Sequence, residues 1–346
     1  MLTRREGLPD KIPISICVDI EPDTRCIDPR ERVPWTGFEE LHPYMNRQRE
    51  LLEKATDGAV RFSWNLRLDP QIEHVYGTAG WAVERYMSLF EALTAEGDEI
   101  GLHPHAWRWS EKEDCWIGDH DNDEWIEHCV RLSNRAYREC FGKAPRVFRF
   151  GDRFMSNRIM GLLEELGILC DLTLEPGHAA TRTLSTDERT TGWIPNYRRV
   201  PHAPYRPSRR NFRRPGLRTF RKLWEMPAST GQPRGIIPGL PYPAPRWLTM
   251  IIGFPFPAVK QIFEQRLSDV RPHIVALART DVTRNPFTKE RLDLFFDFLL
   301  THPERERFMF VTPLEALKEL AGETFNFRQA QNQAPRPTSL SLTRSR

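Results

Sequence analysis

The stretch that decides the fold is residues 12–23, IPISICVDIEPD, an apolar run that ends in alternating carboxylates. Ile12 to Val18 has the composition of a buried strand, and Asp19, Glu21 and Asp23 follow it at every second position. Side chains alternate between the two faces of an extended chain, so we expect these three carboxylates to lie on one side. The run therefore predicts a strand that ends in a polar, acidic edge.

Short β-like runs alternate with helical patterns along most of the chain, which is typical of a mainly parallel sheet covered by helices. Long Pro-rich segments at Thr181–Arg221 and Ser229–Phe256 are predicted to be irregular. The predicted strands are Ile12–Val18, Val60–Leu66, Glu99–His103, Arg146–Phe150, Ile168–Leu172, Leu223–Met226, Ile274–Ala278 and Phe308–Val311, and the predicted helices are Glu39–Ala55, Trp81–Ala95, Asp123–Phe141, Ser156–Leu166, Lys289–Leu300 and Pro313–Leu320.

The length of 346 residues is enough for one compact domain with a full core. We expect an N-terminal extension over residues 1–11, one domain over residues 12–322, and a disordered polar tail over residues 323–346, where apolar periodicity ends.

Charge and cysteine usage exclude several classes of protein. The formal net charge of +3, from 50 basic and 47 acidic residues, predicts no nucleic-acid partner. The six cysteines form no C-x-x-C pair, which argues against a zinc finger or a disulfide-stapled scaffold. The N-terminus lacks the pattern of a signal peptide or a membrane span, so we expect a cytoplasmic protein with reduced thiols.

Polar residues also follow two later strands, where a parallel α/β protein places its active site. The third predicted strand runs into Gly-Leu-His-Pro-His, which ends in His103 and His105. Two imidazoles and a carboxylate with open positions suit a catalytic zinc or a similar divalent ion. The fourth strand ends with Arg149 and Asp152, where an arginine beside a carboxylate would orient it.

These features together resemble a known family. An acidic turn after the first strand, Gly-x-His after the third and an arginine-bearing turn after the fourth occur in the order and rough spacing of the polysaccharide deacetylases, the NodB-homology enzymes of the carbohydrate esterase family four type. The stretch FMFVTPLEAL, from Phe308 to Leu317, also looks like the last strand and helix of that family. The resemblance spans Ile12 to Leu320 and implies an irregular (β/α) barrel of about seven strands.

The resemblance also implies roles for individual residues. Asp19 corresponds to the catalytic base, Glu21 to the acidic metal ligand, His103 to the first histidine ligand, and Arg149 to the arginine that tethers the base. By the same pattern, the metal polarises an acetyl carbonyl, a metal-bound water attacks it, and Asp19 takes the proton.

The chain departs from the family pattern at three places. Trp107 stands where the second histidine is usual, so His105 must serve as the second histidine ligand. Glu21 replaces the more common aspartate. The late strand Ile274–Ala278 runs into Arg279 instead of a histidine, which leaves the general acid unassigned and offers Arg279 as an oxyanion stabiliser.

Five further residues near these strand ends are candidates for substrate contact, each with a structural alternative. Asp23 could instead belong to a turn or a helix cap. Arg67 and Asp69 could form a structural ion pair. Trp107 could close the core instead of stacking on a sugar ring, and Asp152 could pair with the neighbouring arginine.

A basic segment from Arg206 to Lys222 holds seven arginines and one lysine without any acidic residue. A solvated loop is the plain interpretation. The density of charge also suits an anionic glycan carrier or the anionic surface of a membrane.

The hypothesis that the sequence favours is a metal-dependent hydrolase that removes an acyl group, N-acetyl above all, from a sugar or glycan precursor in polysaccharide biosynthesis. Two alternatives stay open. One is a catalytically degenerate barrel that binds a glycan or its carrier, which the altered histidine spacing favours. The other is a metal-dependent amidohydrolase that acts on a different carbon–nitrogen bond.

Overall fold

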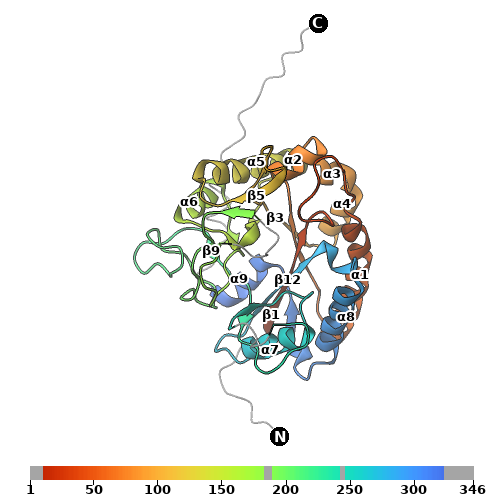
Figure 1. Ribbon diagram of the computed structural model, residues 1–346. Coiled ribbons are helices and arrows are strands. Elements are labelled where there is room, and N and C mark those ends of the chain that lie inside the picture. Colours follow the sequence, from red (N-terminus) through yellow and green to blue (C-terminus); the bar gives the residue numbers. More distant parts are fainter. Residues whose placement is uncertain (1–10, 183–188, 242–245, 323–346) are drawn as a thin grey trace.

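The computed structural model describes residues 11–182, 189–241 and 246–322. Its main sheet follows the order β12-β1-β2-β3-β6-β7-β9, with β13 paired to β1, and every pairing in it is parallel. The sheet curves into a half-barrel with helices on its outer side (Figure 1). The predicted irregular (β/α) barrel is therefore confirmed. Apart from Lys11, the predicted N-terminal extension lies outside the described residues, as does the predicted tail.

The main-sheet strands are β1 Ile12–Ile20, β2 Ser63–Leu66, β3 Glu99–Leu102, β6 Val147–Phe148, β7 Cys170–Asp171, β9 Trp224–Glu225, β12 Ile274–Arg279 and β13 Phe308–Phe310. Smaller sheets contain β4 Trp107–Ser110 with β5 Cys115–Asp119 and β8 Arg189–Thr191, and β10 Thr230–Gly231 with β11 Leu248–Thr249. The helices are α1 Thr36–Thr56, α2 Pro70–Tyr76, α3 Trp81–Arg85, α4 Met87–Ala95, α5 Asp123–Phe141, α6 Asn157–Leu166, α7 Phe256–Leu267, α8 Pro286–Thr301 and α9 Pro313–Ala321.

Strand β1 forms the centre of the molecule. All nine of its residues are buried, as expected for a parallel strand that is covered on both faces. It pairs with β12 on one side, and with β13 and then β2 on the other. At its carboxyl end, Asp19 lies in register with Asn65 on β2 and with Arg279 on β12. The register alone therefore brings two polar neighbours to the predicted base.

The structure differs from the sequence-based prediction at several helices. The predicted helix Trp81–Ala95 is broken at Tyr86, which accepts a hydrogen bond from the backbone N–H of Trp35 and closes a cluster of aromatic rings. Two helices that were not predicted are also present, α2 and α7. Asp69 caps α2 by accepting hydrogen bonds from backbone N–H groups in the first turn of that helix. Pro70 begins α2, and Pro257 lies in the first turn of α7.

All six cysteines are free thiols, and three of them are buried. In the described parts of the chain, no helix combines the length and the apolar character that a membrane crossing requires.

Two buried acids face each other on neighbouring strands beyond the centre of the sheet. Asp171 on β7 lies in register with Glu225 on β9, and the hydroxyl of Thr173 donates to Asp171 Oδ1 at 2.5 Å. Burial raises the pKa of Asp171 to about 6, and burial together with the Asp171 charge raises the pKa of Glu225 well above its ordinary value. A shared proton between the two carboxyl groups is consistent with both shifts.

This acid pair predicts a specific dependence of stability on pH. Its contribution is complete below the pKa of an unfolded aspartate, about 4, and is lost as the pH rises through about 6. In urea titrations between pH 4 and 8, the double variant Asp171→Asn, Glu225→Gln should lack this loss, which we expect to be on the order of 2 kcal/mol. Parallel curves for the variant and the parent chain would contradict the assignment.

Candidate metal centre

The two predicted histidine ligands lie just beyond strand β3 and face each other. The backbone N–H of His103 still donates to Leu66 O at 2.8 Å, so the chain stays extended into the site. His103 Nδ1 lies 2.8 Å from the carbonyl oxygen of Arg149, which accepts the Nδ1 proton and leaves Nε2 with its lone pair. His105 Nε2 is 3.3 Å from His103 Nε2. Both ring nitrogens therefore converge on one point.

Glu21 completes this group. Its Oε2 atom is 3.8 Å from His105 Nε2, and one ligand atom from each of Glu21, His103 and His105 lies within 4.8 Å of the others. All three side chains are buried, and Glu21 Oε2 has no hydrogen-bond partner. A buried carboxylate oxygen without a hydrogen-bond donor, opposite two imidazole Nε2 atoms, is a donor set that fits a divalent ion. We call these three residues the ligand trio.

The surroundings set the ionisation of the ligand trio. Burial opposes the charge on Glu21, but the cations around it, Arg279 first, lower the pKa of this carboxyl to about 2. Burial lowers the pKa of His103 and lowers that of His105 well below its ordinary value. An ionised carboxylate and two neutral imidazoles are the forms that bind metal.

The predicted base lies directly beside the ligand trio. Arg149 Nε donates to Asp19 Oδ2 at 3.0 Å, which confirms the expected pairing of these two side chains. Asn65 Nδ2 donates to the other oxygen, Oδ1, at 3.2 Å. Asp19 Oδ2 is also 3.7 Å from His103 Nε2. The carboxylate is therefore held from two sides with one edge toward the ligand trio.

Arg149 is fixed in turn by groups beyond β6. Its NH1 atom donates to the carbonyl of Leu172 at 3.2 Å, and NH2 lies 3.6 Å from Glu175 Oε1. Glu175 Oε2 is 3.3 Å from Arg153 NH1. The base is thus the first member of a chain of alternating charges.

Asp152 supports His105 from the side away from the ligand trio. His105 Nδ1 lies 3.3 Å from Asp152 Oδ2, the indole N–H of Trp107 donates to the same oxygen at 2.9 Å, and Arg25 forms an ion pair with the carboxylate. A carboxylate behind a metal-binding imidazole fixes the ring and its tautomer. Asp152 and the next residue, Arg153, both have positive φ, 56° and 57°, which is uncommon for residues other than glycine.

The remaining substrate-contact candidates lie in supporting positions. Arg67 and Asp69 form a bidentate ion pair at 2.8 and 3.0 Å, and Asp69 also accepts the backbone N–H of His105 at 3.0 Å. Trp107 is only 2% exposed, so its ring faces are covered. Asp23 accepts the N–H of Gly37 in the first turn of α1 at 2.8 Å. These positions favour the structural alternatives given above for all four residues.

Arg279 lies at the mouth of the site with 28% of its side chain exposed. Its Nε atom is 3.0 Å from Glu21 Oε1, while Arg67 NH1 lies 3.7 Å from Glu21 Oε2. A guanidinium thus neutralises the carboxylate that belongs to the ligand trio. Each buried carboxylate around the site is likewise paired with an arginine. The pairs are Asp19 with Arg149, Glu21 with Arg279, Asp69 with Arg67, Asp152 with Arg25, and Glu175 with Arg153.

Sequence reasoning missed Asn65, Glu175 and Arg25. A signal existed for the first two, because each stands at or just after the carboxyl end of a predicted strand. Arg25 lies on the irregular turn after Glu21, where neither spacing nor residue type indicates its contact with Asp152.

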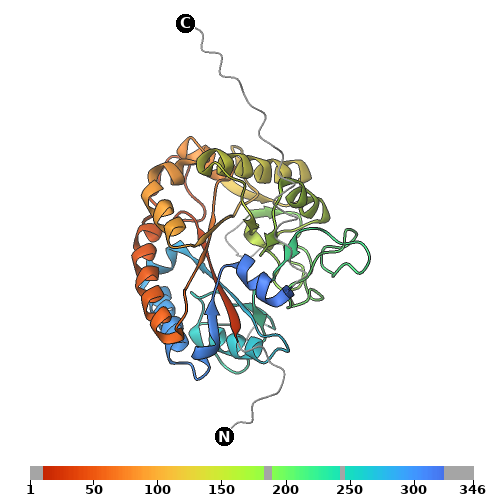
Figure 2. The same ribbon diagram turned by 180° about the vertical axis from the view of Figure 1, so that it is seen from behind.

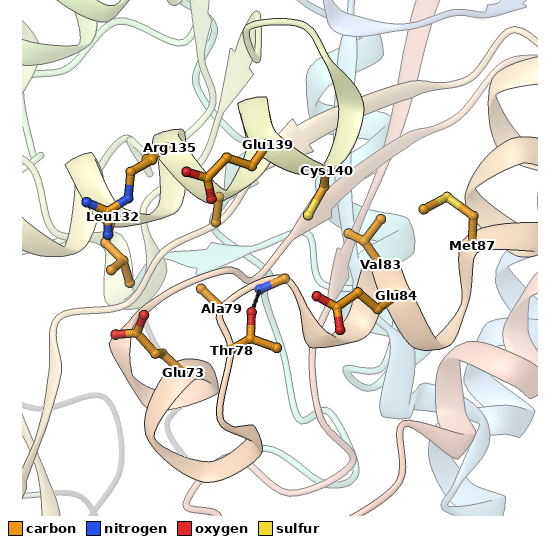
Figure 3. Close-up of a pocket in the computed structure, with 12 residues that line it drawn as sticks. Glu73, Thr78, Ala79, Val83, Glu84, Met87, Leu132, Arg135, Glu139 and Cys140 are labelled. Carbon is orange, nitrogen blue, oxygen red and sulfur yellow. Dashed lines mark hydrogen bonds between the residues drawn. The ribbon is translucent and has the colours of Figure 1, made fainter. Parts of the chain in front are cut away.

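A pocket also lies on the outer face of the barrel, where side chains from α3 and α5 face one another (Figure 3). Glu84, Glu139 and Cys140 line it, and none of the ligand trio or its neighbours does. This pocket is therefore separate from the candidate metal centre.

Because Arg279 and a metal ion would share Glu21, we expect Arg279→Gln to tighten binding of Zn²⁺ by about tenfold or more, through loss of charge repulsion. Competition with a chromogenic chelator would measure this change without any activity assay. His103→Ala should abolish binding in the same titration. An unchanged or weaker affinity in the Arg279 variant would show that Arg279 does not compete with the ion.

Comparisons with known proteins bear on the fold. The family model of glycosyl hydrolase family 57 matches residues 86–207, which is fewer than half of the chain, whereas the sequence motifs resemble the NodB-homology deacetylases. No curated protein sequence matches the chain.

Solved structures of similar architecture include three bacterial proteins. A protein from Mycobacterium smegmatis assigned as a polysaccharide deacetylase has a TM-score of 0.50 and 13% identity, over 96% of this chain and 95% of that one. One from Pseudomonas aeruginosa PAO1 with the same assignment has a TM-score of 0.51 and 14% identity, over 92% and 94%. One from Parabacteroides distasonis assigned as a glycoside hydrolase/deacetylase has a TM-score of 0.53 and 12% identity, over 89% and 71%. The chain therefore shares the fold of these proteins.

Proposed function

We propose that the chain is a metal-dependent hydrolase that removes an acyl group, acetyl on the nitrogen of an amino sugar, from a glycan or glycan precursor. The observation that carries this proposal is the position of Asp19. Its carboxylate is oriented by Arg149 and Asn65 and lies 3.7 Å from His103, inside a barrel mouth that also holds the ligand trio. The assignment of neighbouring folds as polysaccharide deacetylases supports the same class of substrate.

In this proposal the ligand trio holds the ion, which when bound supplies a Lewis acid that polarises the acyl carbonyl and activates water. Asp19 accepts the proton of the attacking water. A carboxylate has about four acceptor sites, so the hydrogen bonds from Arg149 and Asn65 leave Asp19 free to accept that proton. Arg149 keeps the carboxylate in the productive orientation, because its planar guanidinium is fixed at two other contacts, with Leu172 and Glu175.

We assign the general acid to Asp281, which the sequence left open. Arg279 cannot fill this role because a guanidinium keeps its protons. Asp281 Oδ2 lies 3.3 Å from Arg279 NH2, so a single guanidinium separates it from Glu21, and its side chain is 32% exposed at the mouth. Burial raises the pKa of Asp281 against the opposing effect of Arg279. Two carboxyl groups in different environments can divide acid and base roles between them.

The base assignment predicts the effect of Asp19→Asn. With zinc-loaded protein and N-acetylated amino-sugar oligosaccharides, the variant should release acetate with a kcat lower by about 10²-fold or more, since it cannot accept the proton. Zinc affinity, measured by competition with a chelator, should remain. The exposed Asp297→Asn on α8 is a matched control and should act as the parent chain does. Equal acetate release by the Asp19 variant and the parent would remove the base from the mechanism.

The acid assignment is tested by the leaving group. Asp281→Asn should lower kcat on an N-acetyl sugar by about 10²-fold, because the amine must be protonated as it leaves. An aryl acetate, whose phenolate leaves without a proton, should be cleaved almost as fast as by the parent chain. Loss of activity on both substrates to the same extent would assign Asp281 a structural role instead.

A glycan- or carrier-binding barrel without turnover is a second candidate function. The specific observation in its favour is the ion pair between Glu21 and Arg279, which already satisfies the charge of the acidic ligand. Protein purified without chelator decides between the two. Stoichiometric metal together with acetate release supports the hydrolase, whereas glycan binding by a metal-free protein supports the binding barrel.

A further inference from the structure

A basic arm, residues 205–222, projects from the body of the barrel beside α6 (Figures 1 and 2). It is an irregular hairpin closed by the bridges Pro207↔Pro215 and Ser208↔Phe220. Backbone N–H groups of residues 208, 216 and 221 donate across the hairpin at 2.8–2.9 Å. The arm therefore has a defined shape within the described chain.

Two residues of α6 hold the arm at two places along its length. Asn157 donates to the carbonyl of Arg210 at 2.8 Å and accepts from the N–H of Phe212 at 2.9 Å. Glu164 accepts from the backbone N–H of Lys222 at 2.8 Å and from Arg209 at 3.1 Å. This anchoring holds the arm in one orientation on the barrel.

The cations of the arm divide into two groups. Arg206 stacks on Phe220 at 4.1 Å and Arg221 is buried against α6, so these two stabilise the arm itself. Arg210, Arg214 and Arg218 are exposed, and the arm contains no acidic residue. Glu164 on α6 forms ion pairs with two cations of the arm, Arg209 and Arg221.

An apolar side chain lies among the exposed cations. Leu217 is 94% exposed and stands between Arg214 and Arg218, in the part of the hairpin enclosed by the two bridges. An isolated exposed leucine needs no explanation by itself. An exposed leucine flanked along the chain by two exposed arginines has the chemistry of a membrane-surface contact, where apolar side chains enter the interface and cations meet anionic headgroups.

We propose that the basic arm docks on the anionic surface of a lipid bilayer, with Leu217 inserted into the headgroup region and Arg210, Arg214 and Arg218 against lipid phosphates. This contact is independent of the proposed hydrolysis. It places the barrel at a membrane surface, while the ligand trio lies at the strand ends and takes no part in docking. A soluble phosphate would be bound by the arginines alone and would leave Leu217 without a role.

Vesicle co-sedimentation of the full chain tests the proposal. The protein should sediment with vesicles of phosphatidylglycerol and phosphatidylcholine at low salt, should be released as salt rises, and should not sediment with phosphatidylcholine alone. The triple variant Arg210→Gln, Arg214→Gln, Arg218→Gln and the single variant Leu217→Ser should each lower the partition coefficient by about tenfold or more.

Matched controls test whether vesicle binding depends on the basic arm or only on exposed cations and exposed apolar side chains anywhere on the protein. Arg32→Gln, Arg85→Gln, Arg135→Gln removes three exposed cations elsewhere, and Val270→Ser removes a side chain that is 88% exposed. Both control variants should bind the vesicles as the parent does. Absence of vesicle binding by the parent, an equal loss in the control triple variant, or an unchanged Leu217→Ser variant would each overturn the proposal. Binding of inorganic pyrophosphate without vesicle binding would assign the arm to a soluble anion instead.

Discussion

The ion pair between Asp19 and Arg149 is the constraint on which the rest of the site depends. Strands β1 and β6 are not neighbours, because β2 and β3 lie between them in the sheet. In a flat sheet their backbones would be about 14 Å apart. The 3.0 Å contact therefore requires both the curvature of the half-barrel and the full length of an arginine side chain. A change that flattened the sheet would therefore separate Asp19 from Arg149 even if each strand kept its own structure.

The need to pair a buried carboxylate, which Asp19 and Arg149 illustrate, also explains why the mouth of the barrel holds so many arginines. A buried carboxylate is unfavourable unless it is paired, and the site collects several carboxylates at adjacent strand ends. Each one meets a guanidinium, which makes the group neutral as a whole and gives it a fixed geometry. Removal of one partner from such a pair typically destabilises a protein by about 3–5 kcal/mol, because it leaves a buried charge uncompensated. Catalytic geometry and stability are therefore linked in this region.

The sequence was informative where local pattern alone determines structure. The apolar run of β1, its acidic end and the His-Pro-His turn predicted the polar strand ends, whereas the pairing of Asp19 with Arg149 was expected from the family resemblance. The contacts of Arg25 and Trp107 could not be predicted, because they depend on how loops cross the barrel mouth. Tyr86 illustrates the same limit, since its helical spacing was clear but its hydroxyl pairs with the backbone of a distant segment and breaks the helix. Helix α2 was missed although Asp69 and the proline after it are a strong start signal.

The consecutive left-handed residues Asp152 and Arg153 have a consequence for attempts to make the protein more heat-resistant. Glycine adopts positive φ without steric strain, so glycine at either position would relieve the backbone. That exchange would relax the backbone but delete the carboxylate behind His105 and the cation beside Glu175. The loss of these buried ion pairs outweighs the strain relieved, so thermostability libraries should hold both positions constant.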